Sequence, residues 1–208
     1  MGLAETYNYY YHEIADPRVT NWPLMGDPWP IILIIASYLY FVFQYDPRFM
    51  QNRPAYELKT FIRFYNLFQV FANAYIVSEV LAVYPDATAL RCDEGDDSWN
   101  PDAVRVARTF YYVILLKMVD LIETGLFVLR KKKNQISFLH HISTILFGVI
   151  LGGYISGGMA VFYPALNSAV HVQFVFLLLH AFVSLKPSCH VTKLPAIFMI
   201  PNILLKLF

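Results

Sequence analysis

Six apolar stretches, each near the length of a membrane-spanning helix, constrain the fold of this chain more than any other feature. A helix needs roughly 20 apolar residues to cross the hydrocarbon core of a bilayer. The stretches occupy residues 28–45, 62–84, 106–129, 137–157, 160–185 and 194–208. Hydrophobic residues make up 57% of the chain and charged residues only 15%, against roughly 25% charged residues in soluble domains. We therefore expect an all-α, multi-pass membrane protein that forms one domain over residues 1–208.

The loops between these stretches alternate in charge. Basic residues gather in segments 46–63 and 130–133, whereas segment 85–105 is mostly acidic. Because basic loops stay in the cytosol, we expect the amino terminus on the lumenal side. The first residues lack a basic start before an apolar core, so the first span is expected to direct insertion. The net charge of +1 argues against a nucleic-acid partner.

The third stretch carries ionisable side chains within the segment KMVDLIET. Lys117, Asp120 and Thr124 fall at i, i+3 and i+7 and so share one helical face, with Glu123 at its edge. Ionisable groups at membrane depth are costly and mark functional sites by default. A structural ion pair would explain Lys117 with Asp120, but not why a second acid shares the face.

Histidines begin the fourth stretch and recur in the fifth. His140 and His141 follow the basic run, and the segment NSAVH holds Asn167 and His171. With the stripe of the third stretch, they predict a polar chamber between helices. A di-iron centre needs more imidazoles than the six histidines present. Adjacent histidines project ~100° apart on a helix, which disfavours a shared zinc ion. Nucleophilic or general-base work by imidazole remains.

Motifs along most of the chain resemble the very-long-chain fatty acid elongase (ELO) family. In chain order they are DPRVTNWPLMGDPWP, RPAYELK with YNLFQV, LRC, KMVDLIET with LFVLRKKK, NQISFLHH and PALNSAVHV. The resemblance implies a seven-helix bundle in the endoplasmic reticulum membrane, enclosing the polar chamber and an acyl tunnel. It also implies that a long-chain acyl-CoA condenses with malonyl-CoA, releasing carbon dioxide and CoA and leaving a longer 3-oxoacyl-CoA.

The resemblance also implies roles for individual residues. A box histidine takes the acyl group or abstracts a proton, and the NSAVH histidine lies beside it. The candidate catalytic residues are His140, His141, His171, Asp120 and Lys117. The candidate substrate-binding residues are Glu123, Thr124, Asn134, Gln135, Asn167, Arg63, Lys131 and Lys132. An amide or Lys117 would stabilise the enolate oxygen, and the cations would receive the CoA phosphates.

No cofactor is expected beyond the two CoA substrates, and the expected partners are the other enzymes of the elongation cycle and a second elongase in a homo- or heterodimer. Glycines at 148, 152, 153, 157 and 158 suit either tunnel walls or close helix packing. Chain-length preference would follow from tunnel depth, which the motifs do not set.

The sequence departs from the family pattern in several places. The family box reads H-x-x-H-H, whereas His140 and His141 are adjacent. The distance along the chain to His171 gives His141 the last place, so His140 stands for either the first or the middle histidine. Losing three residues changes the helical phase by ~60°. The family order of Glu then Asp is reversed in Asp120 and Glu123.

At the carboxyl end, prolines interrupt the stretch 194–208 and a seventh span is absent. We therefore keep two hypotheses: a 3-oxoacyl-CoA synthase, and a catalytically impaired homologue that acts as a non-catalytic partner of active elongases. An incomplete gene sequence would produce the same departures. A transporter would show inverted-repeat hydropathy, which is not visible.

Overall fold

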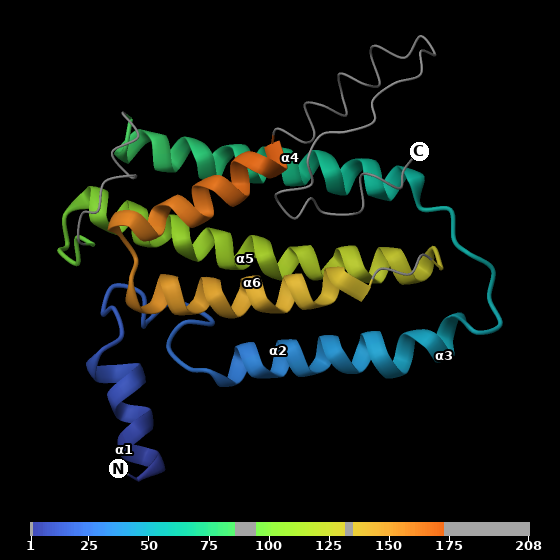
Figure 1. Cartoon of the computed structure of the whole chain (residues 1–208), viewed down its shortest axis with the longest axis horizontal. Coiled ribbons are helices and arrows are strands. Elements are labelled where there is room, and N and C mark those ends of the chain that lie inside the picture. Colours follow the sequence, from blue (N-terminus) through green and yellow to red (C-terminus); the bar gives the residue numbers. More distant parts are fainter. Residues whose placement is uncertain (1, 86–94, 132–134, 173–208) are drawn as a thin grey trace.

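A computed structural model describes residues 2–85, 95–131 and 135–172, and in these ranges every regular element is a helix. A short helix α1 (Leu3–Asn8) and a π-helical turn (Tyr9–Glu13) precede the first long helix. The rest of the expected fifth stretch and all of residues 194–208 lie outside the described residues. The helices run roughly parallel to the long axis of the molecule, apart from α1 and residues 162–172 (Figure 1).

The first long helical run consists of α2 (Trp29–Tyr40), a π-helical turn (Phe41–Tyr45) and α3 (Asp46–Met50). Pro30 stands in the first turn of α2, where a missing N–H costs no hydrogen bond. Only Ile31 and Tyr38 of α2 are buried, so most of its apolar side chains face outward. A helix that is apolar on all sides and exposed on most of them suits a lipid environment.

Helix α5 (Pro101–Leu129) is the centre of the bundle and packs against both α4 (Lys59–Val83) and α6 (Gln135–Tyr154) (Figure 1). Asn100 caps its start by accepting a hydrogen bond from the backbone N–H of Asp102 (3.4 Å). The buried face of α5 extends over its whole length and includes Ala107 and Ile114, both fully buried.

Small residues let α5 and α6 approach closely. A Cβ added at Gly152 would lie 3.1 Å from Ile114, and one added at Gly148 would lie 3.4 Å from the same side chain. These two glycines therefore serve helix packing. The helical segment 162–172 packs near its start on α4 and α5, where Val161 joins a cluster with Val80 and Phe110.

Two described helical runs are long and apolar enough to cross a membrane, Trp29–Met50 and Lys59–Val83, and the apolar part of α6, Leu139–Tyr154, is shorter. Helix α5 covers the expected third stretch but contains several ionisable residues. The structure thus agrees with an all-helical fold over the described residues, and the expected number of membrane spans stays a prediction.

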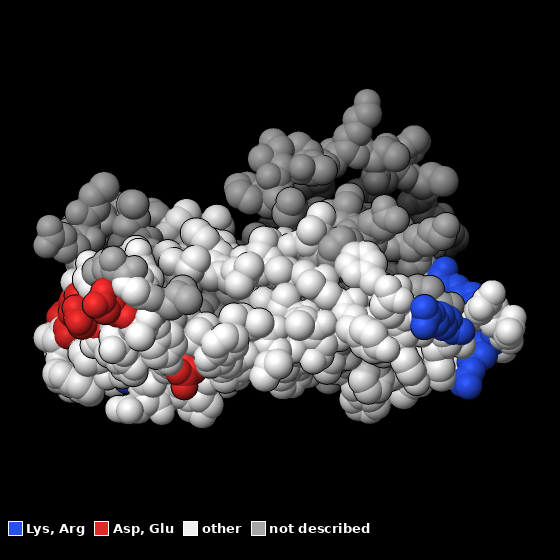
Figure 2. Space-filling model, turned by 90° about the horizontal axis from the view of Figure 1, so that it is seen from below, with Lys and Arg blue, Asp and Glu red and all other residues white. Residues whose placement is uncertain are grey.

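Charge separates to the two ends of the molecule. In Figure 2 acidic side chains gather at one end, basic side chains at the other, and an uncharged band lies between them. The exposed acids Asp96, Asp97 and Asp102 adjoin the start of α5, whereas the exposed cation Lys131 follows its end. This distribution follows the loop alternation in the sequence and fits a bundle whose middle lies in lipid.

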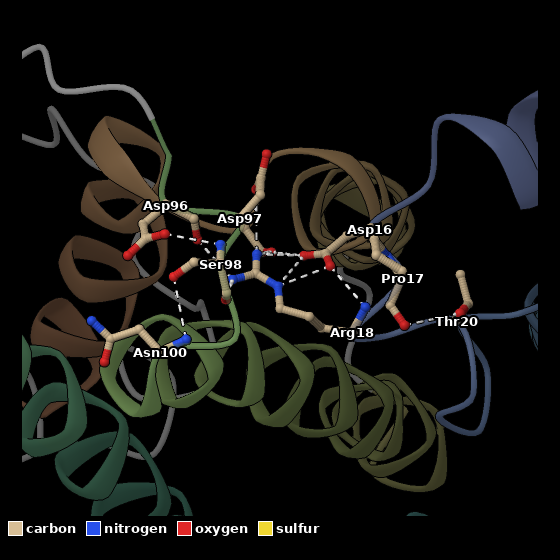
Figure 3. A network of polar contacts seen from close by, with 9 residues as sticks. Asp16, Pro17, Arg18, Thr20, Asp96, Asp97, Ser98 and Asn100 are labelled. Carbon is tan, nitrogen blue, oxygen red and sulfur yellow. Dashed lines mark hydrogen bonds and ion pairs between the residues drawn. The ribbon is translucent and has the colours of Figure 1, made fainter.

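A buried ion pair closes the acidic end. Arg18 is 3% exposed and its Nη2 lies 2.6 Å from Oδ2 of Asp16 (Figure 3). The guanidinium also donates to the backbone oxygens of Asp96 (2.7 Å) and Ser98 (3.1 Å). Asp16 accepts from the hydroxyl of Ser156 (2.5 Å). This network, the Arg18 clasp, joins the amino-terminal loop to the segments before α5 and after α6.

The clasp also sets the ionisation of Asp16. Burial alone would raise the pKa of its carboxyl, but hydrogen bonds from Arg18 and Ser156 outweigh burial and hold that pKa below its ordinary value. Close backbone packing continues the seam, because a Cβ added at Gly157 would lie 3.0 Å from the Cα of Gly95.

Candidate active site

The ionisable stripe of α5 faces the interior of the bundle. Lys117 and Asp120 are each 3% exposed, Glu123 is 5% exposed and Thr124 is 4% exposed. Lys117 Nζ lies 2.9 Å from Asp120 Oδ2, which makes a buried ion pair within one helix. Helix periodicity places these residues together, as the spacing in KMVDLIET predicts.

Helix α6 brings a histidine to the second acid of the stripe. Nε2 of His141 lies 3.0 Å from Oε2 of Glu123, and both side chains are buried. A carboxylate in this place can hold the imidazole ring in one orientation through a hydrogen bond. Glu123, a substrate-binding candidate from the sequence, thus contacts His141, and its expected role in substrate binding stays a prediction.

The other two candidate histidines belong to the same electrostatic cluster. The rings of His140 and His141 have their centroids 5.7 Å apart at an angle of 57°. His171, on the helical segment 162–172, is partly buried and feels the charges of Lys117 and Asp120 and the rings of both other histidines. We call this cluster of ionisable side chains from α5, α6 and the segment 162–172 the polar chamber.

Helix α4 contributes polar side chains that are not among the candidate residues predicted from the sequence. Gln69 Nε2 donates to Oδ1 of Asp120 (2.5 Å), and Asn73 Nδ2 donates to Oε1 of Gln69 (3.2 Å). Tyr65 OH lies 3.5 Å from Oδ1 of Asp120. The available signal was the spacing of Tyr65, Gln69 and Asn73 at i, i+4 and i+8, which places three polar residues on one face of an apolar helix.

Thr124 meets a further residue that the motifs did not indicate. Its Oγ1 lies 2.6 Å from the hydroxyl of Tyr38 on α2, and both residues are buried. This hydrogen bond joins the outermost long helix to α5. Tyr38 is recognisable in the sequence only as a polar group within an apolar run.

The remaining candidate residues take no part in the contacts described above, or they lie outside the described residues. Asn167 is partly buried, and Arg63 and Lys131 are exposed. Lys131 has a left-handed backbone conformation (φ 54°) just after the end of α5. Gln135 is the first residue of α6. Lys132 and Asn134 lie outside the described residues.

Three buried acceptor atoms lack donors among the described residues. Glu123 Oε1, Asn73 Oδ1 and Asn167 Oδ1 are buried and have no hydrogen-bond partner among the residues that the structure describes. Buried polar atoms in native proteins nearly always have partners. Ionisable groups and acceptors together in a buried chamber suit acid–base or acyl-transfer chemistry.

Comparison with known proteins gives a consistent answer. The model of the GNS1/SUR4 family, abbreviated ELO, matches residues 23–208. Mouse very long chain fatty acid elongase 1 is 40% identical over 169 residues, which cover 78% of this chain and 61% of the mouse protein. Rat very long chain fatty acid elongase 7 is 40% identical, with 78% of this chain and 59% of the rat protein covered.

Human very long chain fatty acid elongase 4 is 36% identical over 177 residues, covering 82% of this chain and 56% of the human protein. The matched region of this chain thus corresponds to somewhat more than half of the length of each of these three relatives.

Proposed function

The chain belongs to the GNS1/SUR4 (ELO) family of fatty acid elongases, and on that premise we propose that it condenses a long-chain acyl-CoA with malonyl-CoA as a very-long-chain 3-oxoacyl-CoA synthase. The observation that carries the proposal is the buried pair of His141 and Glu123, 3.0 Å apart, together with the buried Lys117–Asp120 ion pair on the same helix. The similar proteins are named fatty acid elongases; the activity of this chain, the reaction and the residue roles are our proposal.

The first half-reaction is acyl transfer to an imidazole. A ring nitrogen of His140 or His171 attacks the thioester carbonyl, the carbon–sulfur bond breaks, and CoA leaves as a thiolate. The attacking ring loses its N–H proton to a neighbouring base, and a proton returns to the departing sulfur. His141 is suited to act as this base, because Glu123 stabilises the imidazolium that forms.

The second half-reaction is decarboxylation and condensation. The bond between the α-carbon and the carboxylate of malonyl-CoA breaks, carbon dioxide leaves, and the electron pair remains as an enolate. The enolate carbon attacks the acyl-imidazole carbonyl, the carbon–nitrogen bond breaks, and the released ring nitrogen takes up one proton from the medium. A fixed donor beside the enolate oxygen lowers the barrier, and buried Lys117 is the cation available for this in the described chamber.

Further parts of the proposal rest on the family and on charge. The cations Arg63, Lys131 and Lys132 would bind the CoA phosphates at the basic end, and the growing chain would occupy an acyl tunnel. Asn134, Gln135 and Asn167 are proposed to contact substrate. The proposed setting is the endoplasmic reticulum membrane with a lumenal amino terminus, beside the other enzymes of the elongation cycle.

One specific observation favours a second candidate function. The family box provides three histidines, whereas this chain has only His140 and His141 there, and His141 is engaged by Glu123. A homologue with an incomplete box would keep the fold and act as a non-catalytic partner of an active elongase.

The deciding experiment measures condensation directly. Membranes that contain the protein are incubated with labelled malonyl-CoA and long-chain acyl-CoAs, and labelled 3-oxoacyl products are separated. We expect product with the unmodified chain, a loss of about 100-fold or more with His141→Ala or His171→Ala, and no change with His12→Ala, which alters an exposed histidine far from the chamber. If the unmodified chain makes no labelled product, the enzyme proposal is wrong and the non-catalytic function stands.

A further inference from the structure

The polar stripe of α4 reaches the ion pair of α5 through Gln69. Gln69 is 8% exposed and Asn73 is 1% exposed, so neither amide is hydrated at the surface. Gln69 Nε2 lies 2.5 Å from Oδ1 of Asp120 and 2.9 Å from the hydroxyl of Tyr65. Among the described hydrogen bonds of Asp120, those from another helix come from Gln69 and, at 3.5 Å, from Tyr65.

A backbone carbonyl fixes the orientation of the two amides. Asn73 donates to the backbone oxygen of Gln69 (2.7 Å), and a carbonyl oxygen can only accept, so the Asn73 atom on that side must be Nδ2. The same Nδ2 donates to Oε1 of Gln69 (3.2 Å), which turns the other end of the Gln69 amide toward Asp120. The orientation of the Asn73 amide thus determines that of the Gln69 amide, and Gln69 presents its N–H group, not its carbonyl oxygen, to Asp120.

Both oxygens of Asp120 are consequently occupied by donors. Gln69 takes Oδ1, and Lys117 takes Oδ2 at 2.9 Å. An ionised carboxylate accepts hydrogen bonds at both oxygens, whereas a protonated carboxyl must donate one. The arrangement therefore suits Asp120 as a fixed anion, and it directs one N–H of the Lys117 ammonium to Oδ2. Among the described residues the ammonium makes no other hydrogen bond, so its other two N–H bonds are available to a substrate.

We propose that Gln69 is a positioning residue for condensation: through Asp120 it fixes the position of the Lys117 ammonium, so that this cation can stabilise the anion that forms during the reaction. The inference rests on the proposed function and deepens it. Gln69 itself contacts Asp120 and not the reacting atoms. Its amide supplies a neutral donor, which keeps Asp120 ionised without adding a second cation to the chamber.

Two substitutions separate this role from simple packing. Gln69→Leu replaces the amide with an apolar side chain of similar size and so removes the donor. We expect kcat to fall about 10- to 100-fold at every pH while KM changes by less than about twofold. Gln69→Glu puts a second carboxyl beside Asp120, and two adjacent carboxyls retain a shared proton. While it is protonated, the introduced carboxyl donates to Asp120 as the amide does.

The activity of Gln69→Glu relative to the unmodified chain should therefore be highest at acidic pH and fall as pH rises. Gln44→Leu, the same change at an exposed glutamine of the first helical run, should leave kcat and its pH profile unchanged. A Gln69→Leu variant with unchanged kcat, or a Gln69→Glu variant whose relative activity does not change with pH, would overturn the proposal.

A spectroscopic readout keeps this test independent of the proposed function. Infrared spectra of the purified protein in detergent should show a protonated-carboxyl band at neutral pH for Gln69→Glu. That band should be missing from the unmodified chain and from the double variant Gln69→Glu, Asp120→Asn. If the band appears but the unmodified chain makes no 3-oxoacyl product, the amide orients Asp120 and the condensation proposal alone fails. If the band does not appear, the Gln69 inference fails, whatever the activity.

Discussion

The length of the Glu123 side chain suits the position of the histidines. In the family pattern the first acid of the stripe is Glu and the second is Asp, and the histidine box is three residues longer. This chain has Asp120 and Glu123 with adjacent histidines, and Glu123 Oε2 reaches Nε2 of His141 at 3.0 Å. Shortening the box changes helical phase by ~60°. A longer second acid would restore contact with a ring displaced in this way, so we interpret the two departures as linked.

Shortening Glu123 tests that link. Glu123→Asp withdraws the carboxylate by about one carbon–carbon bond, and a displacement near 1 Å can cost about 100-fold in rate. Glu123→Gln keeps the length but removes the charge that stabilises an imidazolium, so it should also lower kcat about 100-fold or more. Steady-state kinetics with both CoA substrates measure these losses.

The double variant Glu123→Gln, His141→Ala provides the control. If the two residues act as a unit, it should be little worse than His141→Ala alone. Effects that multiply would instead show that Glu123 acts on something other than His141.

Helix α5 illustrates what sequence could and could not predict. A helical period of 3.6 residues places Lys117, Asp120 and Thr124 on one face, and the structure has all three buried. Their partners come from other helices, and period alone does not determine which helix faces which. The contacts of Gln69 with Asp120 and of Tyr38 with Thr124 depend on how α4 and α2 pack around α5. The contact of Glu123 with His141 was not predicted for the same reason, because it depends on the approach of α6.

Helix α2 is tied to the bundle by few buried groups, so its hydrogen bond to α5 should matter. Tyr38→Phe removes the hydroxyl 2.6 Å from Thr124 Oγ1 and leaves the aromatic ring in place. We expect the free energy of unfolding to fall by about 1 kcal/mol, since one buried hydrogen bond is lost and the Thr124 hydroxyl can turn to its own helix. Unfolding of the purified protein in detergent measures the change. Tyr40→Phe alters an exposed ring (64%) and should have no effect; equal losses for both variants would contradict this account.

The charged residues of the whole molecule are distributed unevenly along its length. Most basic side chains visible in Figure 2 lie at one end and most acidic ones at the other. Lys117, Asp120 and His141 are buried inside the bundle. On the proposed function, this arrangement would attract the negatively charged phosphates of CoA to the basic end. The acidic end is instead closed by the Arg18 clasp, in which one buried arginine holds three segments together. At the acidic end, therefore, a buried ion pair also joins segments that are distant in the sequence.

The clasp makes stability depend on pH in a defined direction. Hydrogen bonds from Arg18 and Ser156 hold the pKa of Asp16 below its ordinary value of 3.8 in the folded protein. A group with a depressed folded pKa binds more protons in the unfolded state, so its stabilising contribution is complete above the unfolded pKa and is lost as pH falls through the folded pKa. Between neutrality and about pH 5 that contribution should be constant, because Asp16 is ionised in both states.

Asp16→Asn removes this titration. Below about pH 4 the unmodified chain should lose unfolding free energy with falling pH more steeply than Asp16→Asn, because only the unmodified chain must protonate the clasp carboxylate. Near neutrality, Asp16→Asn should have a lower free energy of unfolding than the unmodified chain, because Arg18 remains buried without its anion. Unfolding curves of the purified protein across this pH range compare the two. Asp102→Asn, at an exposed acid of the same end, should follow the unmodified chain. Parallel acid profiles for Asp16→Asn and the unmodified chain would show that the clasp carboxylate does not couple stability to pH.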